Sequence, residues 1–146
     1  MGELLGIPEW LAMTLWVVGA LLIWLALGFF VHRRGRRRLA AKRACISKPE
    51  FVVSLAPEVE GRIAEWLWDQ ADPYYQPLRP HPDDHLLRDA MIDDGDIGMD
   101  WVSDFAKAMN LDEKRFPDWP NGWDLTMRNY ARWLQQAVDA RAVVAG

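Results

Sequence analysis

The sequence has a single cysteine, Cys45, and only three histidines among its 146 residues. One cysteine excludes an intrachain disulfide and is typical of a protein in a reducing compartment. The sequence also has no paired nucleophile and base, no Gly-rich phosphate loop and no Cys/His cluster. We therefore expect no catalytic residue, no metal ligand and no cofactor, and we predict that the chain is not an enzyme.

Two of the histidines lie close together in a proline-rich segment, but their spacing does not predict a metal site. Prolines on both sides of His81 prevent a regular helix through it, so its imidazole and that of His85 share no fixed face. The pattern also matches no recognised ligand spacing. We expect instead that Asp83 or Asp84 caps a short turn over residues 86–91.

Charged residues are absent from Trp10–Val31, a run of 22 residues. At about 1.5 Å per helical residue, this run spans roughly 33 Å, enough to cross a hydrocarbon core of about 30 Å. A helix of a soluble protein needs a polar face, whereas Thr14 is the one polar residue here. A cleavable signal peptide is disfavoured, because residues 1–9 contain no lysine or arginine and the apolar run is too long. The run therefore predicts a single transmembrane helix.

Basic residues are lacking before this helix and concentrated directly after it. Positively charged flanks stay in the cytoplasm, so we expect the N-terminus outside and the rest of the chain in the cytoplasm. The same residues either contact anionic lipid headgroups or act only as a topology signal. They are Arg33, Arg34, Arg36, Arg37, Arg38, Lys42 and Arg43.

The charge of the chain changes sign after the basic flank. Residues 1–48 carry eight basic and two acidic side chains, whereas residues 49–146 carry nine basic and nineteen acidic ones. An acidic domain argues against nucleic acid as a partner. We predict four parts: a short N-terminus outside the cytoplasm (1–9), the transmembrane helix (10–31), a basic juxtamembrane segment and linker (32–56) and an acidic helical domain (57–146).

Apolar residues recur at helical spacing in the acidic domain, which predicts an all-α fold. The apolar run at residues 51–53 either packs on this domain or lies at the membrane surface, and the sequence does not decide between them. The expected helices run from a cap at Ser54 to about Ala71, from a cap at Asp96 to Met109, and from a cap at Asp124 to about Ala142.

The segment Leu86–Phe116, LLRDAMIDDGDIGMDWVSDFAKAMNLDEKRF, resembles the centre of an acyl carrier protein. Those domains are small acidic four-helix bundles in which a serine at the start of the second helix, preceded by an aspartate, carries phosphopantetheine. Matching Met109 to the apolar residue at the end of that helix places Gly95 at the serine and Asp94 at the aspartate. Glycine has no hydroxyl, so the resemblance implies a domain that does not carry phosphopantetheine.

The Asp-Gly-Asp sequence at this point is similar to a family of bacterial acyl-carrier-like proteins known only as domains of unknown function. The resemblance implies a bacterial acyl-carrier-like helical bundle. Together with the predicted transmembrane helix, it leads us to expect the chain at the bacterial inner membrane. We expect an interaction module that presents an acidic helix face to a basic protein partner. The alternatives are a non-standard acyl or lipid carrier, a small structural subunit of a membrane complex, or acids that only keep the domain soluble. The candidate partner-binding residues are Asp94, Asp96, Ile97, Met99, Asp100 and Asp104.

Overall fold

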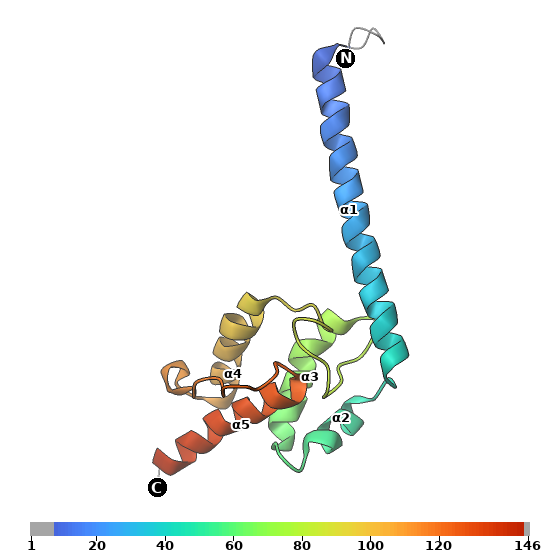
Figure 1. Ribbon diagram of the computed structural model, residues 1–146. Coiled ribbons are helices and arrows are strands. Elements are labelled where there is room, and N and C mark those ends of the chain that lie inside the picture. The colour runs from blue at the N-terminus through green and yellow to red at the C-terminus, as the bar shows by residue number, and fades with distance from the viewer. Residues whose placement is uncertain (1–7, 145–146) are drawn as a thin grey trace. The chain divides into compact units, whose positions relative to one another are not determined.

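The computed structural model describes residues 8–144, which form two units, one ending at Lys42 and one beginning at Arg43 (Figure 1). The described residues form helices and their connections, apart from one antiparallel bridge between His85 and Thr126. The predicted all-α class is therefore confirmed.

The first unit is one long helix, α1 (Glu9–Lys42), which continues past the predicted span that ends at Val31. Its large apolar side chains from Met13 to Val31 are exposed; Trp24, for example, is 74% exposed. The Thr14 hydroxyl donates a hydrogen bond to the backbone carbonyl of Trp10 at 2.8 Å, so this polar group is satisfied within the helix. By its length and composition, α1 is long and apolar enough to cross a membrane.

The second unit begins with α2 (Lys48–Leu55), a helix that the sequence analysis did not predict. The backbone N–H and the hydroxyl of Ser47 both donate to the Glu50 carboxylate at 2.7 Å, and this capping interaction starts the helix. Ser54 consequently lies inside α2, where its hydroxyl donates to a backbone carbonyl. The prediction that Ser54 caps the next helix was wrong, because the Ser47–Glu50 cap starts a helix seven residues earlier in the chain.

Helix α2 belongs to the folded unit rather than to a linker. Phe51 and Leu55 are fully buried, and the Phe51 ring meets the Trp68 ring edge-on at 5.3 Å. Of the apolar run at residues 51–53, Phe51 therefore packs in the domain core, whereas Val53 is exposed. The predicted linker over 32–56 is divided between α1 and the second unit.

Helix α3 (Gly61–Tyr75) packs against both α2 and α5 (Figure 1). It runs beyond the predicted end at Ala71 and includes Pro73 in its last turn. A proline near the C-terminal end removes one hydrogen bond from a turn that is about to finish, which limits its effect. The buried residues of α3 are Ile63, Ala64, Leu67, Trp68, Ala71 and Tyr75.

The second half of the unit contains two further α-helices, α4 and α5, and two short helical turns. A π-helical turn, η2 (Asp96–Asp100), leads into α4 (Trp101–Met109), which ends at Met109 as predicted and is followed by a short 3-10 turn, η3 (Glu113–Arg115). The last helix, α5 (Met127–Val144), begins later than predicted and extends past Ala142. Thr126, and not Asp124, caps it, because the Thr126 hydroxyl accepts the N–H of Asn129 at 3.2 Å.

The aromatic core joins α3, α4 and α5. Trp101 is fully buried at the first position of α4, and its ring lies 5.8 Å from the rings of Tyr74 and of Tyr130. Both contacts are edge-on, the arrangement that aromatic quadrupoles favour. Trp101 therefore fixes the start of α4 against the other two helices.

Candidate functional site

The segment formed by η2 and the start of α4 is the one that the sequence predicts to be a binding surface. The Asp93 carboxylate accepts the backbone N–H of Gly95 at 2.8 Å, and the Asp93 carbonyl accepts the N–H of Ile97 at 3.2 Å. Asp93 is thus the residue that caps this helix start. The expectation that Asp96 is the cap was wrong, because Asp96 already lies inside the π-helical turn.

Two hydrogen bonds attach the π-helical turn to the neighbouring helices. The Tyr74 hydroxyl of α3 donates to the Asp96 carboxylate at 3.1 Å, and the buried Tyr130 hydroxyl of α5 donates to the Ile97 carbonyl at 2.9 Å. Burial, together with the negative charge of Asp96, raises the pKa of Tyr74, so this phenol remains a neutral donor. The turn is therefore held on its inner side by both α3 and α5.

The six candidate residues divide into an inner and an outer set. Ile97 is only 3% exposed, so it is a core residue and cannot contact a partner as proposed from the sequence. Asp96 is half-buried and bound to Tyr74. The other four are exposed, and we call them the acidic face: Asp94, Met99, Asp100 and Asp104.

The carboxylates of the acidic face differ in their pairing. Lys107 lies 3.5 Å from Asp104, an exposed pair within one helix that partly neutralises this carboxylate. Asp94 and Asp100 form no ion pair or hydrogen bond through their side chains with any described residue. The unneutralised charge of the acidic face is therefore concentrated at Asp94 and Asp100, on either side of the sequence position of Met99.

Gly95 occupies the position that the resemblance assigns to the carrier serine. A Cβ atom built there would lie 3.0 Å from an oxygen of the Asp93 carboxylate. A side chain at this position would therefore require the Asp93 carboxylate, which caps the helix start, to move by a few tenths of an ångström. The glycine suits this helix start sterically and supplies no oxygen for a phosphodiester bond.

The basic residues that follow the apolar run also divide into two groups. Arg33, Arg34, Arg37 and Arg38 are exposed on α1. The side chains of Arg36 and Lys42 lie outside the described residues. Arg43, in contrast, has a side chain that is only 11% exposed, and its guanidinium binds the Asp84 carboxylate at 2.7 Å. Assigning Arg43 to the membrane surface was wrong, because its charge is already paired inside the second unit.

The Arg43–Asp84 pair is a buried ionic contact that the sequence did not reveal. Asp84 is 2% exposed, and Arg43 also donates to the carbonyl of Arg79 at 2.6 Å. Burial raises the pKa of the Asp84 carboxyl, and the Arg43 guanidinium opposes this shift. Asp84 is therefore a core residue whose carboxylate binds Arg43, and it does not cap the turn over residues 86–91 as one of the two predicted candidates.

The two neighbouring histidines do not form a common site. The Nδ1 atom of His81 accepts the N–H of Asp83 at 3.3 Å, and the Nδ1 atom of His85 accepts the N–H of Arg88 at 3.2 Å. Burial lowers the pKa of His85, which keeps this imidazole neutral. Among the side chains that the structure describes, no three or more of His, Cys, Asp or Glu are grouped so that they could hold a metal ion.

The acidic face is thus an exposed methionine among carboxylates on a helix start that α3 and α5 hold in place. Its function has to be inferred from these residues. No protein-family model, no curated protein and no solved structure matches the chain.

Proposed function

We propose that the chain is a membrane-anchored, cytoplasm-facing interaction module whose acidic face binds a basic protein partner. The π-helical turn is the observation that carries this proposal. Its inner residues are tied to Tyr74 and Tyr130, while Met99, 70% exposed, points its apolar side chain away from the core. Interruptions of this kind in a helix are frequent at functional sites.

The chemistry of the acidic face favours a basic partner with an apolar contact point. The unpaired carboxylates of Asp94 and Asp100 attract Lys and Arg side chains and raise the rate of encounter. The flexible thioether of Met99 adapts to apolar groups of different shapes. The negative charges therefore supply steering, and the methionine supplies the contact that excludes water.

The proposal includes an acyl-carrier-like domain that carries no phosphopantetheine. Gly95 has no hydroxyl, and a side chain at its position would crowd the Asp93 carboxylate. Binding through charge and one apolar side chain requires no prosthetic arm, so the acidic face alone accounts for the proposed interaction.

The proposed location is the bacterial inner membrane, with α1 as the anchor. Exposed arginines follow the apolar run of α1, so the positive-inside rule places the second unit in the cytoplasm. There, Arg33, Arg34, Arg37 and Arg38 are available to anionic lipid headgroups, each contributing about 1 kcal/mol when it reaches the surface.

Reporter fusions in a bacterial host test this orientation. We expect alkaline phosphatase, which works only in the periplasm, to be inactive when fused after residue 146, and a fluorescent protein fused there to fold. The same phosphatase fused before residue 1 should be active and is the matched control. An active phosphatase at the C-terminus would place the acidic face on the other side of the membrane and contradict the proposal.

Photocrosslinking in cells tests the acidic face itself. A benzophenone amino acid replaces Met99 in one variant and Val53, which is also 70% exposed, in the other. We expect the probe at position 99 to form discrete adducts with other proteins. The probe at position 53 should form none of the same adducts. Adding Asp94→Lys with Asp100→Lys should reduce those adducts about tenfold or more, because attraction becomes repulsion.

The control variant carries Glu65→Lys with Asp118→Lys, which changes the net charge equally at two exposed acids outside the acidic face. Its adducts should match those of the parent chain. Equal adducts from the Asp94/Asp100 and the Glu65/Asp118 reversals would mean that the acidic face recognises no partner and that its carboxylates serve solubility only.

A further inference from the structure

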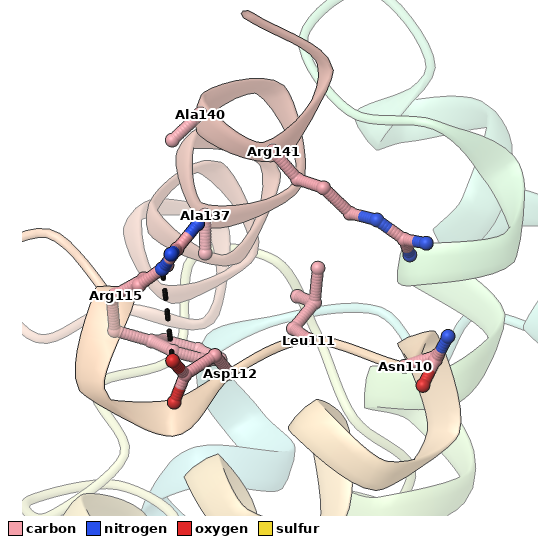
Figure 2. A pocket seen from close by; sticks show the side chains of 8 residues that line it. Asn110, Leu111, Asp112, Arg115, Ala137, Ala140 and Arg141 are labelled. Carbon is pink, nitrogen blue, oxygen red and sulfur yellow. Dashed lines mark ion pairs between the residues drawn. The ribbon is translucent and has the colours of Figure 1, made fainter. Parts of the chain in front are cut away.

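A groove of about 430 Å³ lies between the C-terminal part of α5 and the segment that follows α4 (Figure 2). Its apolar surface comes from Leu111, Phe116, Ala137 and Ala140. The two alanines leave space on α5 that longer side chains would fill. No residue of the acidic face lines this groove, so it is a separate surface of the same unit.

The aromatic floor of the groove is held in place by the core. The ring of Phe116 lies 6.2 Å from the ring of Phe105 and 5.5 Å from the ring of Trp133. Both neighbours are buried, so Phe116 cannot turn inward to close the groove. A floor fixed in this way offers a ligand a preformed apolar surface, and the volume lies in the range of small-molecule sites.

Two guanidinium groups flank this floor, and Figure 2 shows Arg115 and Arg141 on opposite sides of Leu111. One Nη of Arg141 donates to the carbonyl of Met109 at 3.0 Å, which positions the group at the groove. The Nε of Arg115 lies 3.6 Å from the Asp112 carboxylate, too far for a good hydrogen bond. Both guanidinium groups therefore retain donors for a ligand.

We propose that this groove binds a small aromatic carboxylate. A guanidinium matches a carboxylate with paired hydrogen bonds and also stacks on aromatic rings, so Arg115 or Arg141 can bind both parts of such a ligand. The Phe116 ring adds an edge or face contact. The groove is lined by two guanidinium groups and by one carboxylate, that of Asp112, so its lining is net positive and favours an anion. The surrounding residues 49–146, in contrast, carry nineteen acidic and nine basic side chains.

The test measures binding of 2-naphthoate to the full chain in phosphatidylcholine nanodiscs by equilibrium dialysis, with empty nanodiscs as the blank. We expect saturable binding of 2-naphthoate and at least about tenfold weaker binding of the neutral 2-naphthamide, because hydrogen bonds to a charged group are the stronger ones. Binding no greater than that of the blank, or equal binding of the two compounds, would overturn the proposal.

Two variants locate the site. Arg141→Met removes one guanidinium, and Ala140→Phe fills the groove from an exposed position on α5 where the fold tolerates a larger side chain. Both should weaken 2-naphthoate binding by about tenfold or more. Arg88→Met, which removes an exposed arginine that does not line the groove, should leave binding unchanged. Unchanged binding in Ala140→Phe would place the ligand elsewhere, whatever Arg141→Met does, and would refute the assignment.

Discussion

An Arg43→Met variant is expected to lose about 3–5 kcal/mol of unfolding free energy at neutral pH. The substitution leaves the Asp84 carboxylate, which is 2% exposed, without the cation that lies 2.7 Å away. It also removes the hydrogen bond to the Arg79 carbonyl. Urea denaturation of the full chain in nanodiscs, followed by near-UV circular dichroism, measures the loss.

The size of this loss should depend on pH through Asp84. Burial raises the folded-state pKa of its carboxyl above the unfolded value, so the folded chain keeps a proton that the unfolded chain has released. That contribution to stability is present below the unfolded-state pKa and is lost as the pH rises through the folded-state pKa. Without Arg43 the folded-state pKa rises further, so we expect Arg43→Met to be least destabilising near pH 4 and most destabilising near pH 7.

Two controls distinguish the effect of breaking the ion pair on stability from the effect of removing an arginine. Arg37→Met removes an exposed arginine of α1 and should change stability by no more than about 0.5 kcal/mol. Arg43→Met combined with Asp84→Leu removes both charges and should recover most of the loss. If Arg43→Met behaves like Arg37→Met at every pH, the buried pair does not stabilise this unit.

The Arg43–Asp84 contact illustrates what the sequence could not predict. Arg43 closes a run of basic residues and looks like Arg37 or Arg38, yet its partner lies 41 positions away. Local pattern contains no information about such a contact, because it depends on how the proline-rich segment folds back. Aspartate is also a common cap of helices and turns, so the sequence favours that role for Asp84 over a buried ion pair.

A helix could be predicted from the sequence where an apolar pattern extends over many residues. Helix boundaries were less predictable, because short-range capping interactions decide them. The apolar run of α1 and the stripes of α4 and α5 predicted that these helices exist, but several of their predicted boundaries were wrong. Helix α2 was missed although Ser47 and Glu50 have the spacing of a capping box, a signal present in the sequence. Ile97, which lies between residues of the acidic face in the sequence, belongs to the same apolar stripe as Trp101 and Phe105. Its burial could therefore have been predicted.

The π-helical turn is the part of the candidate site that no pattern in the sequence indicated. It adds one residue to a helical turn, and its geometry depends on Tyr74 and Tyr130, which come from other helices. Asp94, Met99 and Asp100 are exposed, as expected from the sequence. The two hydrogen bonds that hold the turn could not be predicted, because they depend on how α3 and α5 pack against it.

A Trp101→Ala variant should lose about 3–5 kcal/mol, the usual effect of deleting a large buried aromatic side chain. Trp101 is fully buried, and its ring contacts Tyr74 of α3 and Tyr130 of α5. Those two tyrosines also supply the hydrogen bonds that hold the π-helical turn. We therefore expect the acidic face to lose its support when the indole is removed.

Hydrogen exchange and urea denaturation of the full chain together check this expectation. In Trp101→Ala, amide protection should fall first over η2 and α4, because these elements depend most directly on the indole. Met99→Ala is the matched control: it shortens an apolar side chain in the same segment that is 70% exposed, and should change stability by no more than about 0.5 kcal/mol. Equal losses in the two variants would mean that Trp101 does not hold the start of α4. A large loss in Trp101→Ala alone, with protection falling first at η2, would show that the surface proposed for the partner depends on one buried side chain behind it.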